Sequence, residues 1–322
     1  MSVRLRIASR TDVGRVRSGN EDAFLVADDV RLVAVADGMG GHQAGEVASA
    51  TAITALLDGL QQGESIADAI TGANDAVWTK AAEDPALRGM GTTLTAGVID
   101  DTSLVIGHVG DSRAYRLRAG ELRQVTTDHS VIAELMAAGE LTEAEALVDP
   151  RRAMITRALG IDPTVTVDVL TVDLEPGDRL LLCSDGLTTM VRDDRIEDIL
   201  ATEADPGGAA DALVAAANAA GGADNITVVV ADVVAADDPD ATPPELPVAS
   251  APAAPPEAIE DTEQVPVVDA DALADADAAD PPDEITAESG GDDVAAETDD
   301  EADEAAAGAA PRRRWWQRRP RP

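Results

Sequence analysis

The pattern of apolar residues stops near residue 234, and this break limits how much of the 322-residue chain can fold. Between residues 233 and 310 the sequence has 24 Asp and Glu residues and no Lys or Arg, and 13 of the 18 prolines lie beyond residue 235. Such a segment buries too little apolar surface to offset the entropy lost on folding. We therefore expect one folded domain over residues 1–234, followed by a disordered acidic tail, rich in Ala and Pro, over residues 235–310.

A short basic tip, residues 311–322, follows this tail and contains six Arg together with Trp315 and Trp316. It either only keeps the chain soluble or binds an anionic surface: acidic lipid, nucleic acid or the chain's own acidic domain. The formal net charge of −38 divides into −20 for residues 1–232 and −18 for the rest. Non-specific binding of nucleic acid requires basic charge, so we do not expect it of the folded domain.

The composition excludes several other classes of protein. Cys183 is the single cysteine, which excludes a disulfide framework and a cysteine-based zinc site. No apolar run approaches the roughly 20 residues that span a bilayer, and the first residues lack the apolar core of a signal peptide. We expect a monomeric, cytoplasmic protein.

The first 234 residues contain many short apolar segments and four longer helical patterns. Segments rich in Val, Ile, Leu and Thr predict strands over residues 3–8, 31–36, 92–99, 104–109, 114–117, 165–172, 179–183 and 226–233. Helical spacing of apolar residues covers residues 45–60, 65–82, 130–138 and 207–220. Because strands and helices do not alternate strictly, an α+β fold is favoured, with the helices covering the outer faces of a pair of sheets.

Acidic residues recur at the ends of predicted strands, usually beside a glycine. The segments are Asn20-Glu21-Asp22, Asp37-Gly38, Gly110-Asp111, Asp185-Gly186 and Asp224-Asn225. One such Asp is usually a turn residue or a helix cap, but several brought together repel one another unless a cation lies between them. Oxygen ligands without cysteine and with few histidines favour Mg²⁺ or Mn²⁺ over zinc. We therefore interpret these residues as a shared metal site.

The glycine-rich segment after Asp37 has a second interpretation, a nucleotide-binding turn. If Gly38 and Gly40 are the first two glycines of a dinucleotide-binding pattern, a third is needed at position 43, which is Gln43. No Lys followed by Ser or Thr completes a phosphate-binding loop either. Nucleotide binding is therefore not expected there.

In chain order, these segments resemble the motifs of the metal-dependent type 2C (PPM) Ser/Thr protein phosphatases, especially the bacterial members. The matching motifs are Arg17…Asn20-Glu21-Asp22, 35–41, 91–93, 107–113, 126–130, 155–160, 184–187 and 223–227. Each motif is weak alone, but the ordered set across residues 1–234 is highly specific. The resemblance implies a four-layer αββα fold, in which helices flank a central antiparallel β-sandwich with metal ions at one end.

The resemblance also assigns metal ligands. By analogy with the family, Asp37 bridges two catalytic ions, Mn²⁺ or Mg²⁺, and the Gly38 carbonyl helps to bind one of them. Asp185 and Asp224 complete the ligands of this pair.

Further roles follow from the same resemblance. Glu21 and Asp22 are expected to act largely through metal-bound water, and Arg17 to bind the substrate phosphate. Bacterial members often hold a third, weaker ion, for which Asp111 and Asp185 are the matching ligands.

The implied activity is hydrolysis of phosphoserine and phosphothreonine in proteins, by a hydroxide that bridges two metal ions. Bacterial relatives usually reverse Ser/Thr kinase signalling, so the expected partners are the kinases and their targets. No protein nucleophile is needed, so Cys183 is expected to be a buried, inert thiol. The alternative is a pseudophosphatase that binds phosphoproteins as a scaffold, but its signature, a lost metal ligand, is not visible.

One position departs from the eukaryotic pattern, where a His after Asp-Gly is the proposed leaving-group acid. Here that position is Met39, which leaves the general acid open between His42 and a metal-bound water. His108 is expected to be structural, whereas His129 has no clear role. Residues 131–152 are either a mobile flap beside the active site or a plain helix–turn–helix.

Overall fold

The structure is a computed structural model that describes residues 3–41, 43–100, 102–146 and 148–236. The chain divides into two units, residues 1–257 and 258–322. The second unit lies outside the described residues, and so do the basic tip and nearly all of the predicted acidic tail.

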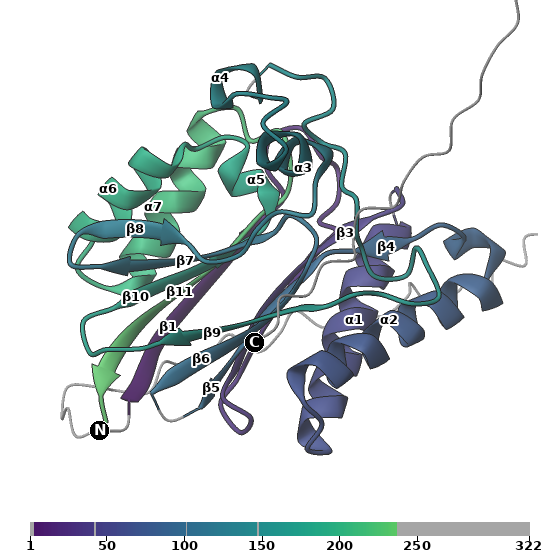
Figure 1. Ribbon diagram of the computed structural model, residues 1–322, viewed down its shortest axis with the longest axis horizontal. Coiled ribbons are helices and arrows are strands. Elements are labelled where there is room, and N and C mark those ends of the chain that lie inside the picture. Colours follow the sequence, from purple (N-terminus) through teal and green to yellow (C-terminus); the bar gives the residue numbers. More distant parts are fainter. Residues whose placement is uncertain (1–2, 42, 101, 147, 237–322) are drawn as a thin grey trace, which may run out of the picture. The chain divides into compact units, whose positions relative to one another are not determined.

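Two antiparallel sheets form the centre of the first unit (Figure 1). One sheet has the strand order β1-β11-β10-β7-β8, and the other has the order β2-β3-β5-β6-β9, with β4 paired to β3. The strands are β1 (Val3–Asp12), β2 (Asp22–Ala27), β3 (Leu32–Met39), β4 (Gly91–Thr92), β5 (Leu94–Asp100), β6 (Ser103–Val109), β7 (Arg113–Arg118), β8 (Glu121–Gln124), β9 (Asp168–Asp173), β10 (Arg179–Cys183) and β11 (Ile226–Ala235).

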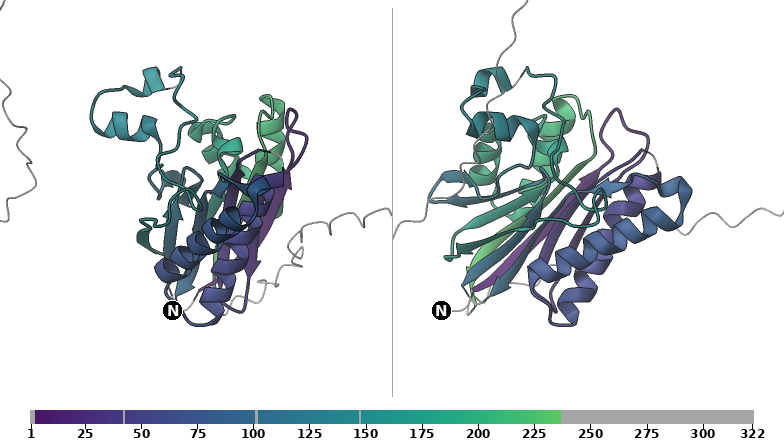
Figure 2. Two further views of the ribbon diagram at one scale, coloured as in Figure 1. Left: turned by 90° about the vertical axis from the view of Figure 1, so that its right-hand side faces the viewer. Right: turned by 45° about the vertical axis from the view of Figure 1, so that its right-hand side comes forward.

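Helices cover both outer faces of this sandwich (Figures 1 and 2). They are α1 (Gln43–Gln61), α2 (Ile66–Glu83), the 3-10 turn η1 (Pro85–Leu87), α3 (Val131–Ala137), α4 (Glu143–Ala146), α5 (Asp185–Thr188), α6 (Asp193–Thr202) and α7 (Pro206–Ala219). The long helices α1 and α2 pack on the β3–β5–β6 sheet, and α5, α6 and α7 pack on the β7–β10–β11 sheet.

The alternation of side chains along a strand explains why there are four layers. On β3, Val33 and Val35 face the other sheet and pack with β10 and β11, whereas Ala34 and Ala36 face α1 and α2. On β10, Leu181 belongs to the cluster beneath α5–α7, while its neighbours face the sandwich interior. This arrangement confirms the predicted αββα sandwich.

Each predicted strand and helix overlaps an observed one, but the sequence prediction missed several short elements. The missed strands are β2 and β8, and the missed helices include α5 and α6. Helix α6 has four acidic residues among ten, and only Ile196, Ile199 and Leu200 are buried. Its apolar stripe is therefore narrow and easily taken for a polar loop.

Candidate metal centre

The antiparallel pairing brings the predicted carboxylates to one end of the sandwich. Strand β2 begins at Asp22, and its register partner near the end of β3 is Asp37. In the other sheet, Asp185 follows the end of β10 and Asp224 precedes the start of β11, strands that pair with each other. A hydrogen bond of 2.7 Å from Ser184 Oγ to Asp22 Oδ2 joins the two sheets at this end.

The carboxyl group of Asp22 lies buried among other acidic side chains at this end of the sandwich. Carboxylates directly opposite on antiparallel strands have Cβ atoms only about 5 Å apart and repel each other. Asp22 Oδ2 accepts the hydrogen bond from Ser184, but the buried Oδ1 has no hydrogen-bond partner among the described residues. Burial, together with the nearby charges of Asp185 and Asp224, raises the pKa of Asp22 to about 7.

Three neighbouring carboxyl groups also have raised pKa values. Burial is the main cause in each case, and the charges of the other aspartates add to it. The pKa of Asp37 is raised well above its usual value, that of Asp111 rises to about 7, and that of Asp185 is also raised. The charge of Asp185 is among the causes that raise the pKa of Asp37, which places the two carboxyl groups close to each other. Divalent cations with oxygen ligands fit this cluster of mutually repelling acids.

Two glycines allow the ligand-bearing segments to approach closely. A Cβ at Gly38 would lie 2.1 Å from the Gly45 carbonyl oxygen, and one at Gly186 would lie 1.9 Å from the Asn225 carbonyl oxygen. A side chain at either position would push these segments apart. Gly38 therefore keeps the end of β3 against α1, and Gly186 keeps Asp185 close to the loop that carries Asp224.

Glu21 lies over the first turn of α1. A Cβ at Gly45 would meet Glu21 Oε2 at 2.0 Å, so the carboxylate lies where the helix dipole favours negative charge. The Glu21 carbonyl accepts hydrogen bonds from Gly38 N (3.1 Å) and Ser49 Oγ (2.6 Å), and Asn225 Oδ1 accepts one from Glu21 N (2.8 Å). Glu21 thus ties both sheets and α1 together beside Asp22.

Arg17 lies at the rim of the cluster and forms an ion pair with Asp224. Its Nη2 is 2.7 Å from Asp224 Oδ2, and the side chains are 49% and 35% exposed. The hydrogen bond to Asp224 raises the pKa of Arg17. The predicted phosphate ligand and a predicted metal ligand are therefore in direct contact.

Among the described residues, no group of three or more His, Cys, Asp or Glu side chains is arranged to hold an ion by itself. Asp224, one of the predicted ligands, is engaged in the ion pair with Arg17. An ion at this end also needs backbone carbonyl or water ligands, which suits the expectation for Gly38, Glu21 and Asp22.

His108 and Cys183, which the sequence analysis also named, are buried side chains. His108 is fully buried, with Thr95 Oγ1 2.9 Å from Nδ1 and the Thr127 carbonyl oxygen 3.1 Å from Nε2, and burial lowers its pKa to about 4. Cys183 is fully buried, which raises the pKa of its thiol to about 12. Both observations agree with the prediction that these side chains take no part in chemistry.

Met39 occupies the position of the proposed acid in eukaryotic relatives, and His42 is one candidate for that role here. The terminal methyl group of Met39 lies where a Cβ of Gly91 would meet it at 2.7 Å, so Met39 packs against β4. His42 lies outside the described residues.

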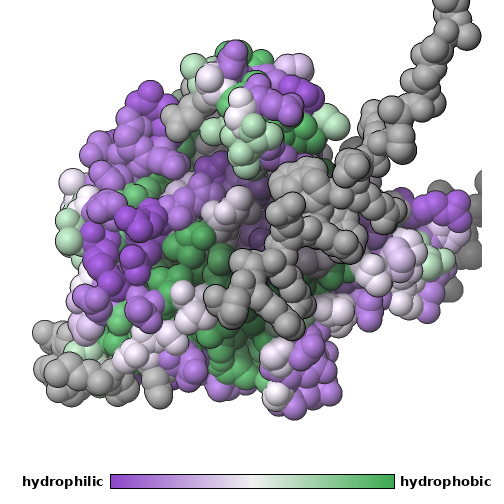
Figure 3. All heavy atoms as spheres, in the orientation of Figure 1, coloured by the Kyte–Doolittle hydropathy of each residue, from purple (hydrophilic) through white to green (hydrophobic). Residues whose placement is uncertain are grey.

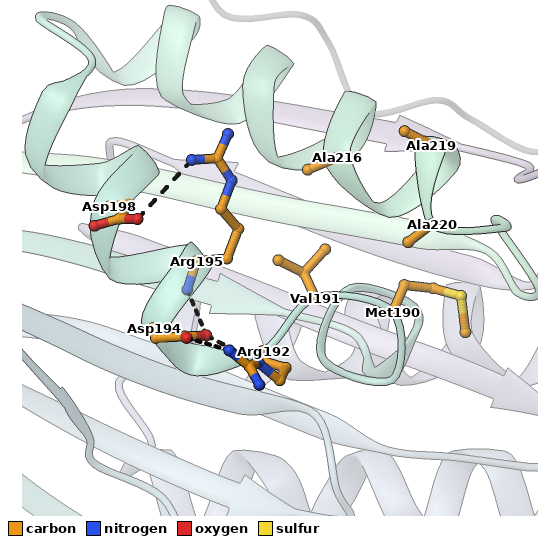
Figure 4. A pocket seen from close by; sticks show the side chains of 9 residues that line it. All are labelled: Met190, Val191, Arg192, Asp194, Arg195, Asp198, Ala216, Ala219 and Ala220. Carbon is orange, nitrogen blue, oxygen red and sulfur yellow. Dashed lines mark hydrogen bonds and ion pairs between the residues drawn. The ribbon is translucent and has the colours of Figure 1, made fainter.

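A separate groove lies between α6 and α7 and contains none of the predicted site residues (Figure 4). Its volume is about 490 Å³. Ion pairs of Arg192 with Asp194 and of Arg195 with Asp198 lie along its edge, beside an apolar floor that includes Val191. Its charges are already paired with one another, so the carboxylate cluster is the stronger candidate for a functional site.

Comparisons with known proteins agree on one family. A model of the family described as protein phosphatase 2C matches residues 15–217. The serine/threonine phosphatase stp of Listeria welshimeri is 42% identical over 236 residues, which cover 69% of this chain and 94% of that protein. The serine/threonine protein phosphatase PstP of Mycobacterium tuberculosis is 43% identical over 239 residues, covering 71% of this chain and 45% of that protein.

The solved structures give the same result. The crystal structure of a PstP catalytic domain in complex with two manganese ions is 41% identical, with a TM-score of 0.66. The match covers 73% of this chain and 100% of that one. Among the described residues, no helix is both long and apolar enough to cross a membrane.

Proposed function

Since the chain belongs to the protein phosphatase 2C family and is a metal-dependent protein Ser/Thr phosphatase, we propose that the carboxylate cluster is its catalytic centre. The observation that carries this proposal is the pairing of Asp22 with Asp37 across two strands, with one buried oxygen of Asp22 unpartnered. Two buried acids face to face repel each other unless a cation or a proton compensates one of them, and the divalent ions of this family would supply that charge. No observation favours the pseudophosphatase alternative, because every predicted ligand position has its oxygen donor.

We assign the ligands as the family resemblance suggests. Asp37, the Gly38 carbonyl, Asp185 and Asp224 would hold two ions, and Asp111 with Asp185 would hold a third, weaker one. When bound, Mn²⁺ or Mg²⁺ supplies Lewis-acid chemistry, since a divalent ion activates water and neutralises phosphoryl charge. Support for manganese comes from the related catalytic domain, which was crystallised with two manganese ions.

The surrounding side chains would orient these groups. Ser184 donates a hydrogen bond to Asp22 and accepts one from Thr227 N at 3.0 Å, so it fixes one carboxylate from the opposite sheet. Glu21 and Asp22 would act through water. The half-exposed guanidinium of Arg17 would exchange Asp224 for the substrate phosphate, which it can bind with two parallel hydrogen bonds.

The expected substrates are phosphorylated proteins, and we propose that they include Ser/Thr kinases and the targets of those kinases. The monomeric state and the cytoplasmic location stay predictions from the sequence.

The proposal is tested with the full chain and a phosphothreonine peptide, with and without Mn²⁺. We expect turnover only with metal, and in Asp37→Asn a loss of at least about a hundredfold, as for removal of one important electrostatic group. The matched control is Asp75→Asn, which changes an exposed aspartate on α2 and should retain full activity. Turnover without metal, or unchanged turnover in Asp37→Asn, would contradict the assignment.

We also propose that the basic tip, residues 311–322, binds an acidic surface of its own catalytic domain. The surface over α6 is largely hydrophilic in Figure 3, and this helix carries four acidic residues and one Arg. Attraction between exposed charges is screened by salt, so removal of the tip should change phosphatase activity at low salt but not at high salt. Equal activity of the full chain and of the chain without residues 311–322 at every salt concentration would refute contact of the tip with the catalytic domain. Co-sedimentation of the tip with anionic vesicles would favour binding to lipid instead.

A further inference from the structure

His129 holds the turn that carries Asp111. Its ring Nδ1 accepts a hydrogen bond from Gly110 N (3.0 Å), and its backbone N donates one to the Gly110 carbonyl oxygen (2.8 Å). Both backbone polar groups of Gly110 are therefore bound by one residue, which lies 19 positions away in the sequence. Asp111 follows directly, so its position depends on this contact.

The opposite side of the same turn packs against Thr93, which lies between β4 and β5. Gly110 has φ +111°, and a Cβ there would lie 2.6 Å from Thr93 Cβ. Thr93 Oγ1 in turn contacts Ser112 Oγ at 2.7 Å and accepts a hydrogen bond from Asp37 N at 2.9 Å. The turn thus lies between Thr93, which also holds Asp37, and His129.

The second ring nitrogen of His129 is fixed as well. Nδ1 faces Gly110 N, so Nε2 is the ring nitrogen that faces the opposite side, where it lies 3.1 Å from Asp168 Oδ2 and 2.9 Å from Arg157 Nη1. Arg157 Nη1 donates to Asp168 Oδ1 (2.8 Å) and to the Thr166 carbonyl oxygen (3.0 Å), which anchors Asp168. The ring is only 7% exposed and packs against His108, with centroids 4.7 Å apart. It therefore has little freedom to turn.

His129 also lies at the neck of the projecting segment that contains α3 and α4, residues 130–155 (Figures 1 and 2). Its carbonyl oxygen accepts a hydrogen bond from Thr156 N at 2.8 Å, and Val131 N donates to the Met154 carbonyl oxygen at 2.9 Å. Ser130 forms a bridge with Ile155 and caps α3 through its side chain. The neck is thus closed by backbone bonds, which gives His129 a rigid support.

We propose that His129 is a positioning residue, which fixes the Gly110–Asp111 turn to the neck of residues 130–155. This contact would orient Asp111 as a ligand of the weaker metal ion. The inference rests on the ligand role proposed above for Asp111. Its consequence is selective: loss of the Gly110 contact weakens the ion held by Asp111 and leaves the ions held through Asp37 in place.

Two substitutions separate the ring nitrogens. In His129→Asn, the amide oxygen takes the place of Nδ1 and retains an acceptor for Gly110 N, but loses the contact with Asp168. In His129→Gln, the amide reaches the position of Nε2 and Asp168, but leaves Gly110 N without its acceptor. We measure Mn²⁺ binding to the full chain without substrate, by electron paramagnetic resonance titration, together with thermal unfolding of each variant.

We expect His129→Gln to weaken the weakest Mn²⁺ site by at least about tenfold, as is typical when a group that orients a metal ligand is removed. His129→Asn should keep that site within about threefold of the native affinity, and the tighter sites should not change in either variant. Ser130→Ala is the control, because it removes a cap at the same neck without touching Gly110, and all its Mn²⁺ sites should be native.

Equal weakening in the Asn and Gln variants, or native binding in both, would overturn the proposal, as would loss of the tighter sites in the Gln variant. Asp111→Asn tests the premise separately. If it leaves the weakest site intact, the ligand role of Asp111 is wrong and the proposal fails with it. If Asp111→Asn removes that site while His129→Gln does not, only the role of His129 is refuted.

Discussion

Asp22→Asn should stabilise the metal-free protein against unfolding and should reduce the additional stability that Mn²⁺ gives. In the native chain, burial raises the pKa of Asp22 from 3.8 to about 7, so the folded state binds a proton more tightly than the unfolded state does. Stability from this group is therefore present at low pH and is lost as the pH rises from about 4 to about 7. Asparagine has nearly the same shape and cannot ionise, so it does not carry this pH dependence.

The size of the effect follows from the pKa values. Each tenfold change in proton affinity corresponds to about 1.4 kcal/mol. The free energy of unfolding of the metal-free variant should therefore be higher than that of the native chain by about 2 kcal/mol at pH 5 and by about 4 kcal/mol at pH 8. These are upper values, because Asp22 keeps some solvent contact. The Asn amide also suits the site, since its oxygen can accept from Ser184 Oγ while its NH₂ replaces the unpartnered Oδ1 beside Asp37.

The assay is urea unfolding of the full chain in EDTA between pH 5 and pH 8, repeated with Mn²⁺. Ligand that binds only the folded state adds stability, so Mn²⁺ should stabilise the native chain more than the variant. Asp75→Asn is the control for removal of an exposed charge and should show a small, constant difference. A difference between Asp22→Asn and the native chain that does not change with pH, or a variant less stable at pH 8, would refute the reasoning.

Three further predictions concern single positions in the same region. Gly186→Ala places a methyl group 1.9 Å from the Asn225 carbonyl oxygen, so we expect the free energy of unfolding, measured by calorimetry, to fall by at least about 2 kcal/mol. A native melting temperature would show that the two segments can move apart without cost. Arg17→Ala should raise KM for a phosphothreonine peptide by at least about tenfold, because a charged hydrogen bond contributes about 1.5–3 kcal/mol; an unchanged KM would remove Arg17 from phosphate binding. Cys183→Ala should keep its kcat, and the native thiol should react with a thiol reagent only after unfolding, since burial raises its pKa to about 12; rapid reaction of the folded protein would contradict this.

The long elements, and the acidic residues of the candidate metal centre, leave local signals in the sequence. Helices α1 and α2 are long and repeat their buried residues with helical spacing. Asp37 lies near the end of the buried strand β3 and Asp185 lies two residues after β10, and each precedes a glycine, a pattern that is visible in the sequence. Their convergence could be expected from the family resemblance, and the strand pairing places Asp22 opposite Asp37.

Long-range contacts of polar side chains were the part that sequence reasoning missed. Nothing local to Ser184 indicates that its hydroxyl reaches Asp22, 162 positions away. His129 was left without a role for the same reason, since its partners Gly110 and Asp168 lie on separate strands or turns. Residues 126–130 were part of the family resemblance, but only the packed sandwich shows which residues His129 contacts.

The proposed metal centre is shared by the two sheets, since Asp22 and Asp37 come from one sheet and Asp185 and Asp224 flank strands of the other. A chain in which only one sheet has formed therefore has only part of the ligand set. With these ligands, metal binding would follow packing of the two sheets during folding, and a newly made chain would be inactive until both sheets had formed. Bound ions would also link the two sheets, so we expect chelation to make this end of the protein the first to become accessible to proteases.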